Sequence, residues 1–343
     1  MNPHLSWRDA LLALAIVFVW GTNFVVIRLG LDALPPLFFA TLRFLFVVLP
    51  AVFFLRKPDV AWSNLAFYGV CIGAFQFGLL FIAMNGHIPP GLASLVIQMQ
   101  VFFTISLSMW RTGERIKPHQ LAAFALAIAG MAVIAAHNGH GVTLLGLGLV
   151  LLAAMGWALG NQAGREAGRG ATGNPERSEG PAGATQKAGA AGNPGRSGGG
   201  ASASVVRRAT QKHQVDMLAY VVWAALFSVP PLLILSLLLE GPAAIATGIR
   251  HAGWTSWAAV LWQSVGNTMF GYACWGWLLS RYPAATVAPM SLLVPVFGFA
   301  ASATLLGEPL PPWKIGATLL IMAGLAVNLL WRRQKTAVSR ESA

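Results

Sequence analysis

The segment that decides the fold occurs twice in the chain. It reads FTISLSMWRTGERIKPHQLAAFALAIAGMAV at residues 103–133 and FGFAASATLLGEPLPPWKIGATLLIMAGLAV at residues 297–327. The copies lie 194 residues apart and align without a gap, so that Gly113-Glu114 falls on Gly307-Glu308. The other first-copy positions that match are Phe103, Ser108, Pro118, Ala123, Leu126, Ala129-Gly130 and Ala132-Val133. Such self-similarity predicts two copies of one structural unit.

The composition around this repeat is that of a membrane protein. Hydrophobic residues make up 56% of the 343 residues, charged residues only 10%, and mean hydropathy is +0.64. A soluble domain would carry about 25% charged residues. A spanning helix needs about 20 apolar residues. We therefore predict an all-α polytopic fold of ten transmembrane helices, at about 11–29, 36–55, 65–84, 92–110, 121–136, 144–161, 217–239, 257–279, 285–306 and 313–331.

The distribution of basic residues predicts the orientation. With a cytoplasmic N-terminus, 19 of the 23 Lys and Arg residues fall on the cytoplasmic side, as the positive-inside rule requires. Both termini are then cytoplasmic. The net charge of +12 thus reflects contact with anionic lipid, and we expect no nucleic-acid partner. The run that begins at Leu11 continues to Leu29, which favours an uncleaved first span over a signal peptide.

Ten spans divide into two repeats of five. The first repeat covers residues 10–137, and the second covers 143–163 together with 215–332. Because five is odd, the second repeat should enter the membrane inverted. Residues 333–343 form a cytoplasmic tail. Residues 164–214 are rich in Gly, Ala, Ser and Arg without apolar periodicity, which predicts a disordered insertion in a cytoplasmic loop that transport does not need.

Several motifs resemble the EamA family of drug/metabolite transporters, and most of all its O-acetylserine/cysteine exporter branch. They are Trp20-Gly-Thr-Asn-Phe24, Pro35-Pro-Leu, Leu42-Arg43-Phe44, Gly91-Leu-Ala-Ser-Leu-Val-Ile-Gln98, Gly113-Glu114 and Ala288-Pro-Met-Ser-Leu-Leu-Val-Pro295. The resemblance covers the chain except about 164–214, where the family has a short loop. It implies ten helices, a central cavity between the halves and export of amino-acid-like metabolites through the inner membrane.

The residues themselves also favour secondary transport, because inverted repeats recur in such proteins and no Walker motif is present. A transporter of another solute class (aromatic amino acids, nucleosides or drugs) and a membrane sensor without flux remain alternatives. We expect no enzyme, since no span pairs a nucleophile with a base. We also expect no cofactor and no metal, since Cys71 and Cys274 lack a ligand spacing. The expected partners are a small polar metabolite and the lipid bilayer, and the oligomeric state stays open.

Polar residues inside spans are the candidate substrate-binding groups, because they are costly in lipid. Arg43 is the sharpest case, near the middle of the second span, where backbone carbonyls, an amide, water or a substrate carboxylate could bind it. The other candidates are Asn23, Gln76, Gln98, Trp157, Asn161, Tyr272 and Trp275. On an α-helix Gln98 and Gln100 point about 200° apart, so we expect only one of them to line the cavity. Glu114 and Glu308 are expected to cap helices at turns.

Overall fold

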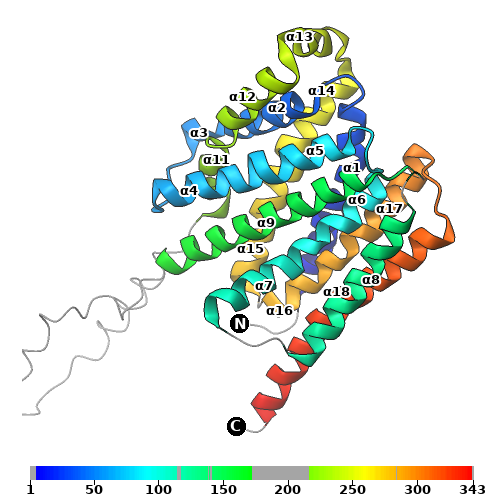
Figure 1. Ribbon diagram of the computed structural model, residues 1–343. Helices are drawn as coiled ribbons and strands as arrows, with labels where there is room; N and C mark the ends of the chain where they lie inside the picture. Colours follow the sequence, from blue (N-terminus) through cyan, green and yellow to red (C-terminus); the bar gives the residue numbers. More distant parts are fainter. Residues whose placement is uncertain are drawn as a thin grey trace, which may run out of the picture.

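The computed structural model describes residues 5–113, 117–137, 139, 141–171, 216–282 and 284–341, and these form helices and their connections without a strand (Figure 1). The first half contains α1 Trp7–Gly30, α2 Pro36–Val48, α3 Ala51–Phe54, α4 Trp62–Gly69, η1 Val70–Gly78, α5 Leu79–Met84, α6 Pro90–Val96, η2 Ile97–Met99, α7 Gln100–Thr112 and α8 Pro118–Ala136. The second contains α9 Leu144–Ala171, α11 Met217–Ala225, α12 Val229–Leu239, α13 Gly241–His251, α14 Trp254–Leu261, η4 Trp262–Phe270, α15 Gly271–Arg281, α16 Ala284–Val287, η5 Ala288–Leu292, α17 Leu293–Leu306 and α18 Pro312–Glu341. The all-helical fold class is confirmed.

Eight described helical runs are long and apolar enough to cross a membrane, and Pro312–Asn328 is a shorter apolar helix. The predicted eighth span corresponds to the run from α14 to α15, which is not among the eight. It carries buried Gln263, Ser264, Asn267 and Thr268, and these polar side chains lower its hydropathy. The count of ten spans therefore stays a prediction.

The two halves share departures from α-helical geometry as well as sequence. Predicted spans three and eight each contain a nine-residue π-helix, η1 at Val70–Gly78 and η4 at Trp262–Phe270. Predicted spans four and nine each contain a 3-10 segment, η2 at Ile97–Met99 and η5 at Ala288–Leu292. Such interruptions are uncommon and often mark functional positions. Their recurrence at nearly equivalent places supports the repeat.

Helices α8 and α18 pack along each other through equivalent small residues (Figure 1). A Cβ added to Gly130 would lie 3.0 Å from the carbonyl oxygen of Ala317, and one added to Gly324 would lie 2.7 Å from that of Ala123. Gly130 matches Gly324, and Ala123 matches Ala317, across the repeat. The contact is therefore reciprocal, as expected where two copies meet about a two-fold axis, and close approach of this kind stabilises helix pairs in membranes.

Gly324→Ala is expected to destabilise the protein by about 1–3 kcal/mol, because the new methyl group meets backbone that cannot move aside cheaply. Gly316→Ala is the matched control in the same helix, since a Cβ there meets nothing within 4 Å and alanine favours the helix. Thermal unfolding of both variants in detergent gives the comparison. Equal melting temperatures for the two variants would contradict the close packing of α8 against α18.

Two carboxylates of the second half cap helices of the first half, each at a proline pair. Glu240 accepts hydrogen bonds from the N–H groups of Leu37 (2.6 Å) and Phe38 (3.0 Å) at the start of α2. Glu308 accepts from the N–H of Gly91 (3.2 Å) at the start of α6. A negative charge at a helix N-terminus is favourable because it meets unpaired N–H groups and the helix dipole. The expected capping role of Glu308 is therefore observed on α6, whereas Glu114 lies outside the described residues.

The boundary of the predicted insertion differs from the structure at its first residues. Helix α9 continues through residues 164–171, where the sequence predicted disorder. The extension is stabilised by an ion pair between Arg111 and Glu166 and by burial of Ala167, so apolar contact and charge pairing offset its poor helix-forming composition. Residues 172–215, which hold the rest of the predicted loop, lie outside the described residues. The predicted tail continues α18 as far as Glu341.

Candidate substrate cavity

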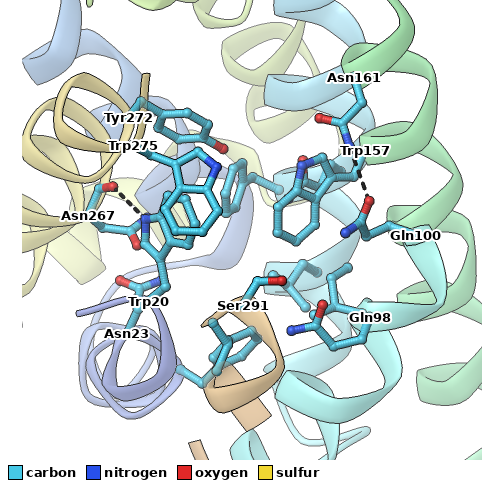
Figure 2. Close-up of a pocket in the computed structure, with 16 residues that line it drawn as sticks. Trp20, Asn23, Gln98, Gln100, Trp157, Asn161, Asn267, Tyr272, Trp275 and Ser291 are labelled. Carbon is cyan, nitrogen blue, oxygen red and sulfur yellow. Dashed lines mark hydrogen bonds between the residues drawn. The ribbon is translucent and has the colours of Figure 1, made fainter. Parts of the chain in front are cut away.

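A cavity of about 210 Å³ lies where the irregular helix segments meet. Its walls come from both halves. The first half contributes α1, η1, α5, η2 and α7, and the second half contributes α9, η4, α15, η5 and α17. The residues that line it are Trp20, Asn23, Phe24, Gln76, Phe77, Leu80, Ile97, Gln98, Gln100, Trp157, Asn161, Asn267, Tyr272, Trp275, Ser291 and Val294 (Figure 2).

The described lining combines side-chain amides with aromatic rings and includes no Asp, Glu, Lys, Arg or His. Six lining residues are Asn or Gln, and each amide offers both a donor and an acceptor. Such a lining can hold a solute that carries both kinds of polar group. It does not provide a side-chain countercharge for a solute with a net charge.

One wall of the cavity is an aromatic cluster. The ring of Trp20 lies 5.1 Å from that of Trp275 and 5.8 Å from that of Tyr272, centroid to centroid. The indole N–H of Trp20 donates to the carbonyl oxygen of Asn267 (3.3 Å), as drawn in Figure 2. The hydrogen bond and the ring contacts hold Trp20 against Tyr272 and Trp275.

The facing wall is formed by Trp157, Asn161, Gln98 and Gln100 (Figure 2). The amide nitrogen of Asn161 donates to the side-chain oxygen of Gln100 at 3.1 Å. Both glutamines line the cavity, so the expectation that only one of them would do so was wrong. The cause is the 3-10 segment at Ile97–Met99. On an α-helix, positions two apart differ by about 200°, which is about 160° by the shorter way around. At three residues per turn the shorter angle is about 120°, and the long glutamine side chains can then both reach the cavity.

Arg43 lies behind the cavity wall and is not among the residues that line the cavity. Its side chain is fully buried. It donates to the side-chain oxygen of Gln263 (3.0 Å) and to the hydroxyl of Thr268 (2.9 Å). Its guanidinium stacks on the ring of Phe77 at 3.5 Å. The space beside it measures only about 10 Å³, room for about one water molecule, so a substrate does not reach Arg43 in this conformation.

Seven of the eight predicted site residues thus meet at one cavity, and Arg43 stands one layer behind it. The seven are Asn23, Gln76, Gln98, Trp157, Asn161, Tyr272 and Trp275. Sequence reasoning did not select Asn267 and Ser291, which also line the cavity, or Gln263, which binds Arg43. The available signal was the cluster of polar residues from Gln263 to Thr268 within an otherwise apolar run. Among the described residues, no group of three His, Cys, Asp or Glu side chains could hold a metal ion.

Comparison with known proteins agrees with this architecture. The model of the EamA-like transporter family matches residues 7–136 and again residues 200–330. A "Probable amino-acid metabolite efflux pump" of Salmonella typhimurium LT2 is 39% identical over 338 residues, which cover 97% of this chain and 99% of the relative. The Escherichia coli K12 protein of the same name is 38% identical over 336 residues, with 97% and 99% covered.

A more distant relative matches most of the chain. A "Probable terminal-alkyne amino-acid exporter" of Streptantibioticus cattleyicolor is 24% identical over 327 residues, which cover 92% of this chain and 91% of the relative. One protein of known crystal structure superposes with a TM-score of 0.54 at 17% identity, covering 95% of this chain and 98% of its own. That likeness concerns the fold alone. With two matched repeats and relatives of nearly 40% identity along its length, the chain belongs to the EamA-like transporter family.

Proposed function

We propose that this multi-pass membrane transporter exports small amino-acid metabolites of the cysteine and O-acetylserine kind across the inner membrane by alternating access. The observation that carries the proposal is the small cavity lined by amides and aromatic rings, with no ionised side chain among its described residues. The relatives named amino-acid metabolite efflux pumps support the same class of substrate.

The lining suits a zwitterion. An amino acid carries a carboxylate and an ammonium group but no net charge, so it needs donors and acceptors more than a countercharge. The cavity presents amides on both walls, including Asn23 on one and Asn161 on the other. Hydrogen bonds between neutral groups and a charged partner contribute about 1.5–3 kcal/mol each. Several such bonds would offset part of the hydration that the solute loses.

The volume favours a metabolite over a drug. Pockets for drug-sized ligands measure about 300–1,000 Å³, and this cavity measures about 210 Å³. Six aromatic side chains line it and occupy much of the space: Trp20, Phe24, Phe77, Trp157, Tyr272 and Trp275. We therefore prefer a small amino-acid metabolite to a drug or nucleoside.

The distribution of Lys and Arg residues and the inverted repeats support an orientation with both termini in the cytoplasm. With both termini cytoplasmic, the insertion and most Lys and Arg residues lie inside, and the caps formed by Glu240 and Glu308 lie on the periplasmic side. Inverted repeats allow the two tilted states of a secondary transporter to expose one central site to opposite sides.

Purified protein in liposomes is expected to exchange labelled cysteine for unlabelled cysteine or O-acetylserine faster than empty liposomes do. Exchange of one amino acid for another needs no driving ion, so it tests the site before the coupling mechanism is known. Aromatic amino acids, a nucleoside and a cationic drug serve as competitors and are expected to inhibit weakly.

The same experiment separates the alternatives. Strong inhibition by one of the other solutes, with no exchange of cysteine, would replace the substrate class but keep the transporter. Absence of exchange with every solute, from a protein that remains folded in the liposome, would favour a sensor without flux.

A further inference from the structure

A chain of three side chains connects the buried guanidinium of Arg43 to the cavity. Arg43 donates to the side-chain oxygen of Gln263 at 3.0 Å. The side-chain nitrogen of Gln263 then donates to the side-chain oxygen of Asn23 at 2.7 Å. All three residues are at most 4% exposed, and of the three only Asn23 lines the cavity.

The chemistry of arginine fixes the direction of every bond in this chain. A guanidinium has five donors and no acceptor, so the atom of Gln263 that faces Arg43 must be the oxygen. The nitrogen of Gln263 must then face Asn23, and the atom of Asn23 that receives it must be the oxygen. The remaining polar atom of the Asn23 amide is its nitrogen, which makes no hydrogen bond to another described residue.

The second amide pair of the cavity provides a contrast. Asn161 donates to Gln100, but neither amide is bound to an ion that only donates or only accepts. Both amides of that pair can turn together and exchange their roles, so the facing wall can adapt to a donor or to an acceptor. Asn23 lacks this freedom as long as Arg43 holds Gln263.

The charge of Arg43 acts in the same direction. The ion pairs among the described residues are Arg28–Asp32, Arg111–Glu166 and Lys314–Glu308, so no described carboxylate neutralises Arg43. Its guanidinium lies against Phe77, which itself lines the cavity. An uncompensated positive charge in a medium of low dielectric attracts a negative group over several ångströms.

From these contacts we infer that Arg43 and Gln263 are positioning residues that make Asn23 an obligatory hydrogen-bond donor, so that the Asn23 wall selects the carboxylate of the substrate. The inference rests on the proposed function and adds to it the end of the solute that this wall recognises. An amino acid would lie with its carboxylate toward Asn23 and its ammonium group toward the adaptable amides.

The substitution that tests this is Gln263→Glu, which nearly preserves shape and reverses the last bond of the chain. A glutamate bound to Arg43 offers only oxygen to Asn23, so the Asn23 amide must turn its nitrogen toward residue 263 and its oxygen toward the cavity. The pair of Arg43 and the new glutamate also has no net charge. The wall would then repel a carboxylate that it had attracted.

The readout is the ratio of two inhibition constants in the cysteine exchange assay, that of an amino acid and that of its methyl ester. Wild-type protein is expected to favour the free acid. Gln263→Glu is expected to reduce this preference about tenfold to a hundredfold, because the substrate carboxylate loses a hydrogen bond from the Asn23 amide and faces its oxygen instead. A ratio is independent of the amount of inserted protein. Thr268→Val is the matched control. It removes another hydrogen bond of Arg43 and one to the backbone carbonyl of Gln263, but it leaves the side-chain bond between Gln263 and Asn23 in place, so its ratio is expected to stay unchanged.

The outcomes are distinguishable. A wild-type protein that exchanges no amino acid would refute the proposed function. A wild-type protein that does exchange, with the same acid-to-ester ratio in Gln263→Glu, would overturn the assignment of Asn23, and so would an equal loss of preference in Thr268→Val. If Gln263→Glu does not insert, Gln263→Met interrupts the same chain and is expected to lower the ratio because Asn23 becomes free to turn.

Discussion

Lys314→Met is expected to destabilise the folded protein by about 3–5 kcal/mol, because it leaves a carboxylate buried without its partner. The ammonium group of Lys314 lies 2.9 Å from a carboxylate oxygen of Glu308. The two side chains are only 4% and 8% exposed. Lys314 also donates to the carbonyl oxygen of Pro309 (3.0 Å), so the substitution removes two interactions at once.

The double variant Lys314→Met with Glu308→Gln is expected to recover much of that loss. Its glutamine is neutral, and its oxygen can still accept the hydrogen bond of the Gly91 N–H that Glu308 accepts at 3.2 Å. Well-packed neutral groups often replace a buried ion pair at little cost, whereas removing one partner leaves an uncompensated charge.

The neighbouring pair of Arg28 and Asp32 is the control. It lines the same outer pocket as Glu308 and Lys314, but its side chains are 44% and 58% exposed, and exposed pairs contribute about 0–1 kcal/mol. Thermal unfolding in detergent should therefore rank Lys314→Met well below both Arg28→Met and the double variant. Equal melting temperatures for Lys314→Met and Arg28→Met would show that the buried pair stabilises the protein no more than the exposed pair does.

The sequence was sufficient to predict the parts of this fold that follow from regular repetition. The offset of 194 residues predicted the two repeats, and the contact of Gly130 and Gly324 with α18 and α8 agrees with it. A helix that crosses the bilayer needs about 20 apolar residues, so most spans could be placed from the length of the apolar runs. The cost of polar groups in lipid also made Asn23, Gln76 and Asn161 recognisable as inward-facing positions.

The errors arose where helix geometry is irregular. A reading that assumes 100° per residue excludes either Gln98 or Gln100 from the cavity, and the 3-10 segment Ile97–Met99 admits both. The π-helix Trp262–Phe270 brings Gln263 and Thr268 to Arg43, a pairing 220 residues apart in the chain that no local pattern indicates. The burial cost of a charge predicted correctly that Arg43 needs partners. The sequence did not show that Gln263 and Thr268 supply them, which places Arg43 behind the cavity wall.

Gln76→Met is expected to reduce exchange of cysteine about tenfold or more while leaving the stability of the protein unchanged or higher. Gln76 lines the cavity from η1 and is 2% exposed, and its amide oxygen is buried without a hydrogen-bond partner among the described residues. Leaving a buried acceptor unpaired costs about 1–3 kcal/mol. Methionine has a similar length and no such group, so folding does not suffer from the replacement.

A buried acceptor that has no partner in the empty cavity can receive a hydrogen bond from a bound solute. The terminal amide of glutamine rotates readily about its last bond, and half a turn exchanges the positions of its oxygen and nitrogen. An ammonium group in the cavity could then donate to the oxygen, and the loss of a hydrogen bond to a charged group corresponds to about 1.5–3 kcal/mol, or roughly tenfold to a hundredfold in affinity.

Ser302→Ala is the matched control for Gln76→Met. The Ser302 hydroxyl is also buried without a partner among the described residues, but Ser302 does not line the cavity. Its removal is expected to preserve or raise the melting temperature and to leave exchange unchanged. Both quantities are measured on the same preparations, as exchange per inserted molecule and as thermal unfolding. If Gln76→Met and Ser302→Ala exchange cysteine equally well, Gln76 does not bind the solute. A melting temperature of Gln76→Met far below that of Ser302→Ala would instead make Gln76 a structural residue whose partner forms in another conformation of the transport cycle.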